Sequence, residues 1–196
     1  MNIHGLSRGL SQQIRRFKRD QEGTSAVEVA MILPVLLTLY LGTVEVSQGL
    51  SMDRRVTLTA RTAADLASQV SSIDNTYMTN LLSASSAVMS CNSVNQCDIS
   101  KLKITVSEVK IDSNQTAKVV WSDTFNGAKR SVGSSVSLPT ALKILNTNLI
   151  WSEVSYSFKP TVGYVITGTL SLSDQIFMRP RLADCVTRIT GSTQVC

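Results

Sequence analysis

Residues 26–46 read AVEVAMILPVLLTLYLGTVEV, an apolar run whose only charged side chains are Glu28 near its start and Glu45 near its end. A helix of these 21 residues rises about 31 Å, which matches the hydrocarbon core of a bilayer. A secretory signal peptide has a shorter apolar region followed by a small-residue cleavage site, and neither feature is present here. The run therefore predicts a retained transmembrane helix over residues 24–46.

The segment before the run, residues 1–23, is a short basic leader. Lys and Arg residues beside a membrane helix remain on the cytoplasmic side of the membrane. We therefore expect a single-pass protein of a bacterial inner membrane, with a cytoplasmic N-terminus and a C-terminal part in the periplasm or outside the cell. The basic residues of the leader are Arg8, Arg15, Arg16, Lys18 and Arg19.

The rest of the chain carries little excess charge. The formal net charge of the whole chain is +5, and charged residues make up only 17% of it. Much of the positive excess belongs to the leader. A nucleic-acid-binding surface needs a dense basic patch, so nucleic acid is not an expected partner.

The four cysteines all follow the apolar run, which fits an oxidising compartment. Proximity favours two local disulfides, Cys91 with Cys97 and Cys185 with Cys196, although four cysteines allow three connectivities. Free buried thiols are the alternative. A metal site is disfavoured because the chain has no Cys-x-x-Cys pair and its one histidine lies in the leader.

The helix that begins in the apolar run is expected to continue beyond it. Pro34 removes one backbone hydrogen bond and predicts a kink near Leu33, which a helix in lipid tolerates. Residues 47–70 contain no proline and keep a helical spacing of apolar side chains, so we expect an unbroken helix that ends against a head formed by residues 71–196. The apolar positions of this second half are Val56, Ala60, Ala63, Ala67 and Val70.

The head is predicted to contain a second helix and an antiparallel sheet. Asn75 or Thr76 is the expected N-cap of the helix, which has Met78, Leu81, Leu82, Val88 and Met89 as its apolar stripe. The Cys91–Cys97 segment is expected to be a loop. Alternating apolar and polar residues predict strands, and the fold class is therefore α+β, a long N-terminal helix with a small antiparallel-sheet head. The predicted elements are a hairpin at 102–106 and 117–121, a short helix at 139–145, a strand at 150–158 and a last strand within 164–178.

Catalytic motifs are missing from the sequence. Without a histidine in the head, no Ser-His-Asp or Cys-His site is possible there, and no glycine-rich phosphate loop occurs. A pair of carboxylates acting as a hydrolase site is the one enzymatic alternative left open. We therefore expect a protein that is not an enzyme, with no cofactor and no small-molecule substrate.

The candidates for an interface in the head are Trp151, Arg179 and Arg181. Trp121 is expected to be partly buried, in phase with Val119 on an inward face, whereas Trp151 falls on the polar face of its strand. Arg179 and Arg181 flank a proline and could bind an acidic partner. The alternative for these two arginines is a solvated strand end.

The segment from Gly23 to Glu28 carries the most specific pattern. A carboxylate inside an apolar membrane helix is costly, so Glu28 calls for a partner. Cleavage after Gly23 would create an amino group on Thr24, one helical turn from Glu28, and this amine or that of an adjacent subunit could neutralise the carboxylate. The alternative is that Glu28 extends to the lipid headgroups.

Two blocks of sequence resemble a known family, the TadE-like pseudopilins of the tight-adherence (Flp) type IV pilus system. The N-terminal block is Arg16-Phe-Lys-Arg-Asp-Gln-Glu-Gly23 followed by Ala26-Val-Glu-Val-Ala-Met-Ile-Leu-Pro34, Gly42 and Glu45. The C-terminal block is Val154-Ser-Tyr-Ser-Phe-Lys-Pro160 with Met178-Arg-Pro-Arg181. Where the family commonly has an aromatic residue after the glutamate, this chain has Val29.

The resemblance implies a prepilin-type leader that a membrane peptidase cuts after Gly23, and a role as a minor pilin in pilus assembly. The implied partners are membrane lipid, the prepilin peptidase, other pilins and the assembly machinery, and the protein could be incorporated into a surface pilus. The competing interpretation is an uncleaved bitopic scaffold or binding module of a secretion complex, whose Glu28 only contacts the membrane interface.

Overall fold

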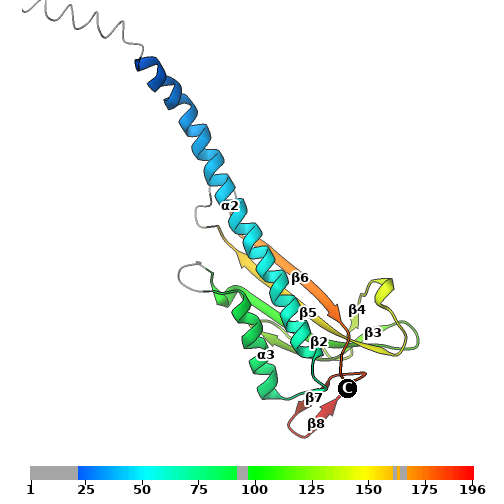
Figure 1. Cartoon of the computed structure of the whole chain (residues 1–196). Coiled ribbons are helices and arrows are strands. Elements are labelled where there is room, and N and C mark those ends of the chain that lie inside the picture. Colours follow the sequence, from blue (N-terminus) through cyan, green and yellow to red (C-terminus); the bar gives the residue numbers. More distant parts are fainter. Residues whose placement is uncertain (1–21, 92–96, 161–162, 164–166) are drawn as a thin grey trace, which may run out of the picture. The chain divides into compact units, whose positions relative to one another are not determined.

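The computed structural model describes residues 22–91, 97–160, 163 and 167–196. Almost all of the predicted leader, and the predicted loop between Cys91 and Cys97, lie outside the described residues. Within the described part, one long helix, a second helix and an antiparallel sheet confirm the predicted α+β class (Figure 1). The chain divides into two compact units, residues 1–44 and residues 45–196.

The long helix, α2, spans Glu22–Ser68 and runs without interruption through Pro34. The predicted continuation toward Val70 is confirmed to within two residues, while the kink near Leu33 stays a prediction. In the second half, small side chains line the buried face and allow close packing against the sheet of the head. Those that are fully buried are Val56, Ala60, Ala63, Ala64 and Ala67.

The second helix, α3, spans Asn75–Val88 and starts one residue earlier than an N-cap at Asn75 implies and two earlier than one at Thr76 implies. Its N-cap is Asp74, whose side chain accepts a hydrogen bond from the Tyr77 backbone N–H at 2.6 Å. The prediction of Asn75 or Thr76 as the cap is therefore wrong, because aspartate binds the free N–H groups of the first turn equally well. The predicted apolar stripe is confirmed at its centre by the buried Met78, Leu81 and Leu82.

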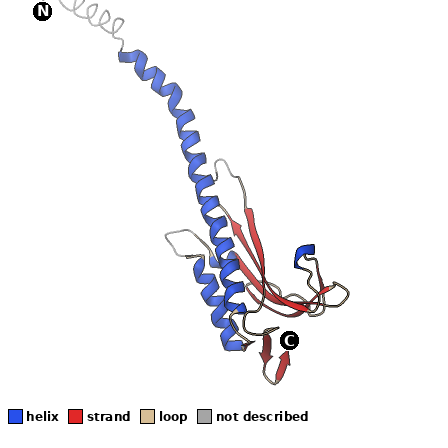
Figure 2. Cartoon of the chain, turned by 45° about the vertical axis from the view of Figure 1, so that its right-hand side comes forward, coloured by secondary structure: helices blue, strands red, loops and turns tan. Residues whose placement is uncertain are grey.

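Five strands form the main sheet in the order β4-β3-β2-β5-β6, with all neighbours antiparallel. Both helices lie on one face of this sheet (Figure 2). We call this the inner face and the opposite one the outer face. The strands are β2 (Leu102–Ile111), β3 (Ala117–Phe125), β4 (Ser135–Val136), β5 (Thr147–Phe158) and β6 (Leu170–Met178), and the short 3-10 helices are η1 (Ile99–Lys101) and η2 (Thr140–Leu142).

A β-bulge in β3 changes which residues face the helices. Glu108 lies opposite Trp121 and Val109 lies opposite Val119, so Val120 has no partner in β2. Trp121 therefore packs in the main core on the inner face, while Val119 shares the outer face with Val109. The expected burial of Trp121 is confirmed, but the prediction that it shares a face with Val119 is wrong.

The two faces of the sheet thus carry separate apolar clusters. The inner cluster joins β2 and β5 to both helices and includes Ile104, Val106, Val154 and Tyr156. The smaller outer cluster lies at one end of the sheet, beneath the segment that contains β4 and η2. Its buried members are Val109, Ile111, Ala117, Leu138, Leu149 and Trp151.

The C-terminal part of the chain forms most of a second, three-stranded sheet. It consists of β1 (Ser72–Ile73), β7 (Thr187–Thr190) and β8 (Thr193–Val195), with β1 parallel to β7. The sequence predicts β6 as the last strand, and this is wrong. The extra strands escape notice because they are short and polar, and because β1 pairs with a segment more than a hundred residues away.

Candidate functional site

The first half of α2 exposes an apolar surface on every side. Residues 23–40 are all exposed, among them Val27 at 56%, Met31 at 74% and Tyr40 at 66% of their full accessible area. Within the described residues this is the one helix long and apolar enough to cross a membrane, with a mean hydropathy of 2.0 over its most apolar window. Such a surface is stabilised by removal from water, and lipid or neighbouring helices both provide this.

Three predicted residues lie in the first two turns of this helix. Gly23, Thr24 and Glu28 are all helical and exposed, and Glu28 follows Thr24 by four residues, which places them on the same side. A side chain in place of the Gly23 hydrogen would meet no atom within 4 Å. The structure thus brings the three residues together, while cleavage and charge pairing stay predictions.

Glu108 is a buried carboxylate that the sequence analysis did not single out. Its Oε1 accepts a hydrogen bond from the Val186 N–H at 2.9 Å, and its Oε2 accepts one from Trp121 Nε1 at 2.7 Å. Burial raises the pKa of Glu108 to about 7 from an ordinary value of 4.5, although these two hydrogen bonds oppose the shift. The carboxylate therefore joins β2 and β3 to the C-terminal segment. The sequence signal for its burial is its spacing. Glu108 follows Ile104 and Val106 at two-residue intervals along β2, so it lies on the same face of the sheet.

Arg188 is a second buried anchor of the C-terminal segment. Its guanidinium donates to Asp123 Oδ2 at 2.6 Å, to Asn75 Oδ1 at 2.7 Å and to the Ile73 carbonyl at 3.2 Å. Lys129 binds the other oxygen of Asp123 at 2.6 Å. One arginine of β7 therefore holds β1, β3 and the start of α3 together, and nothing in the local sequence distinguishes it from a surface arginine.

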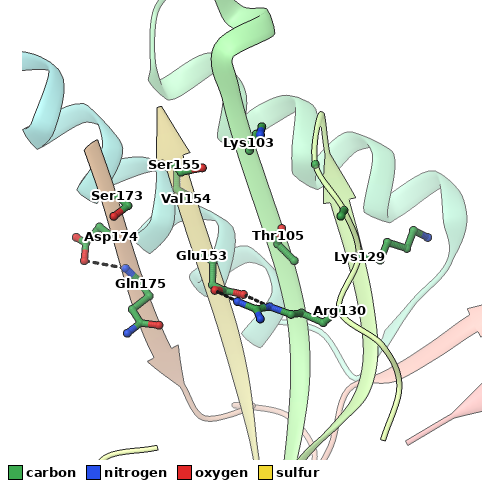
Figure 3. Close-up of a pocket in the computed structure, with 12 residues that line it drawn as sticks. Lys103, Thr105, Lys129, Arg130, Glu153, Val154, Ser155, Ser173, Asp174 and Gln175 are labelled. Atoms are coloured by element: carbon green, nitrogen blue, oxygen red, sulfur yellow. Dashed lines mark hydrogen bonds and ion pairs between the residues drawn. The ribbon is translucent and has the colours of Figure 1, made fainter. Parts of the chain in front are cut away.

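A polar groove of about 680 Å³ crosses the outer face of the main sheet (Figure 3). Arg130 closes one part of it through a bidentate pair with Glu153, with one of the two bonds at 2.9 Å. Lys103, by contrast, has no ion-pair partner among the described residues. The other lining residues are Thr105, Gly127, Ala128, Lys129, Val154, Ser155, Ser173, Asp174 and Gln175.

The groove offers hydrogen-bonding groups but no paired catalytic acids. Glu153 faces outward, whereas Asp174 lies opposite the buried Val154 and so projects from the inner side of β6. The two carboxylates therefore leave the sheet from opposite faces. The described residues also contain no group of three or more His, Cys, Asp or Glu side chains that could hold a metal ion.

Trp151 lies on the outer face, as its alternation predicts, but it is not an open aromatic platform. Only 6% of it is exposed. Its ring stacks on Phe177 with centroids 5.6 Å apart, and the Arg130 guanidinium lies 4.7 Å above its ring centre. A partner would reach this ring only after displacing Arg130, so any interface role of Trp151 is indirect.

The two arginines that follow β6 have different surroundings. Arg181 forms an ion pair with Asp65 of α2, and its backbone N–H donates to the Ser68 carbonyl at 2.9 Å. Arg179 is exposed and has no ion-pair partner among the described residues. Arg181 therefore secures the chain to the end of α2, which leaves Arg179 as the better candidate for an external acidic partner.

Both predicted disulfides are confirmed. Cys91 pairs with Cys97 after α3, and Cys185 pairs with Cys196, which brackets the β7–β8 hairpin. The second bond keeps Val186 beside Glu108, since Val186 directly follows Cys185. The disulfide and the two buried anchors thus act on the same C-terminal segment.

Comparison with known proteins matches residues 23–65 to the family described as TadE-like protein. The match covers the exposed apolar half of α2 and most of its buried half, and it begins at Gly23. Comparisons with curated proteins and with solved structures found no match. Residues 23–65 are thus similar to the TadE-like family, as the N-terminal motif indicates.

Proposed function

We propose that the chain is a non-enzymatic minor pilin that is anchored in the inner membrane and takes part in assembling a tight-adherence (Flp) type IV pilus. The observation that carries the proposal is that the two halves of α2 have different surroundings. Its first half, within the family match, exposes apolar side chains all round, and its second half buries an alanine-rich face in the head. A helix of this kind can remain in lipid or pack beside other helices without any change in the head.

The proposed mechanism starts with removal of the leader. The prepilin peptidase cuts after Gly23, and Thr24 becomes the new N-terminus. Its amine, or that of an adjacent subunit, then neutralises Glu28, which is one helical turn away and costly to leave unpaired in lipid. The head lies in the periplasm in this proposal, which the basic leader and the two disulfides support.

Cleavage is tested by the mass and N-terminal sequence of the full chain, made with and without the prepilin peptidase. We expect the chain to start at Thr24 when the peptidase is present and at Met1 when it is absent. Gly23→Val should block cleavage, and Gly42→Ala, farther along the same helix, should leave it unchanged. A chain that starts at Met1 under both conditions would instead support the uncleaved scaffold.

Assembly is tested by Glu28→Leu in the native system. We expect normal cleavage and membrane insertion but at least about tenfold fewer pili, because the Thr24 amine would lose its counter-charge in a low-dielectric environment. Glu28→Asp keeps the charge and is the matched control. Pili counted by electron microscopy at the wild-type number in Glu28→Leu would contradict the role of the carboxylate.

A further inference from the structure

The main sheet ends in two very different edges. At one edge β4 has two residues, and at the other β6 has nine, paired with β5 in an unbroken register from Leu170 to Met178. No strand pairs with the other side of β6 within the described residues. Proteins usually protect such an edge with proline, lysine, a bulge or a short strand, and β6 has none of these.

Asp174, at the centre of β6, is what protects this edge. Its side chain leaves the strand on the inner side, between Leu172 and Ile176, where a charge disfavours pairing. Its Oδ1 accepts the Gln175 backbone N–H at 2.8 Å, and the carboxylate lies on the side of β6 away from β5 (Figure 3). The carboxylate therefore covers a backbone donor that an added strand would need.

The position of Asp174 disfavours a second copy of β6 as the partner. Antiparallel pairing of two β6 strands about their centres would place two Asp174 carboxylates directly opposite each other, which is destabilising. Shifting the register by two residues would instead place each carboxylate opposite Leu172 or Ile176. A strand with a lysine or arginine at this point would attract the carboxylate and free the Gln175 N–H.

We propose that β6 is a docking edge for an extended strand of a different protein, with a basic residue opposite Asp174 and apolar residues opposite Leu172 and Ile176. Main-chain hydrogen bonds supply the affinity and the alternating side chains supply the choice of partner. The backbone groups that face the free edge alternate along the strand and belong to Ser173, Gln175 and Phe177. This proposal stands independently of membrane anchoring and of cleavage at Gly23.

The test uses the full chain in detergent with both disulfides intact, and two fluorescent seven-residue peptides. One peptide alternates Thr and Val around a central Lys, and the other has Glu in place of that Lys. We expect the Lys peptide to bind about tenfold more tightly, and Asp174→Lys to reverse the preference, because opposite charges that face each other across two strands attract and like charges repel. Hydrogen exchange should show protection of residues 170–178 by the bound peptide.

Two variants control for non-specific attraction. Ser173→Pro removes a backbone donor at the free edge while leaving the β5 side intact, so it should weaken both peptides. Asp184→Lys changes an exposed acid outside β6 and should leave the preference for Lys unchanged. Equal binding of the two peptides, no binding up to about 1 mM, or no protection of β6 would overturn the proposal.

Discussion

The free energy of unfolding of the head is expected to fall by about 3 kcal/mol as the pH rises from about 4.5 to about 7, because of Glu108 alone. The carboxyl titrates near pH 4.5 in the unfolded chain and near pH 7 in the folded one. Between these values the folded state holds a proton that the unfolded state has lost, so stability decreases with rising pH. Its contribution is complete below pH 4.5 and absent well above pH 7.

Denaturant titrations of the full chain at several pH values measure this effect. The only tryptophans, Trp121 and Trp151, both lie in the head, and their fluorescence reports its unfolding. Glu108→Gln is close in size, can still accept from the Val186 N–H and cannot ionise, so the difference between this variant and wild type isolates Glu108. A difference that stays constant from pH 4.5 to pH 8 would contradict the prediction.

Arg188→Met is expected to cost about 3 kcal/mol of stability at neutral pH. The substitution removes the N–H groups that donate to Asn75 Oδ1 and to the Ile73 carbonyl. It also leaves the largely buried Asp123 with only Lys129 as an ion-pair partner. Breaking a buried ion pair typically costs about 3–5 kcal/mol, and the remaining lysine places this case at the lower end. The midpoint of denaturant unfolding measures the loss.

Arg181→Met is the matched control. Arg181 also forms an ion pair, with Asp65, but more than half of its side chain is exposed, and exposed pairs contribute about 0–1 kcal/mol. In the Arg188→Met background, Asp123→Asn should recover part of the loss because it removes the poorly compensated charge. Equal losses of stability in Arg188→Met and Arg181→Met would show that the buried network contributes no more to stability than the exposed ion pair.

The regular elements of this fold can be predicted from the sequence because the apolar residues of each follow a single spacing. Val56, Ala60, Ala63 and Ala67 repeat at the helical spacing, and all four are fully buried. Ile150, Val154, Tyr156 and Phe158 alternate along β5 and are buried too. In both cases the pattern reflects a single continuous element against a single core.

The features that were missed depend on contacts between distant segments. Arg188 contacts Asn75 and Asp123, so its role cannot be seen in a local window. The spacing of Glu108 along β2 indicates which face it lies on, but its hydrogen bond with the distant Val186 N–H cannot be seen locally. Strict alternation predicts that Trp121 faces the same side as Val119, because it does not allow for the extra residue that the bulge inserts between them. The apolar helix, Gly23 and Glu28 were predictable, since the residues that define that candidate site are adjacent in sequence.

The extra residue at Val120 has a consequence for comparing this chain with others of the same architecture. In a homologue that lacks this one residue, β2 and β3 would pair without a bulge, and the tryptophan would directly follow the residue aligned with Val119, still on the inner face opposite position 108. A gap at position 120 is therefore compatible with an acid at position 108 and a tryptophan at position 121. In an alignment, the bulge would then appear as a one-residue insertion in β3 that leaves the facing of the side chains on both sides of it unchanged.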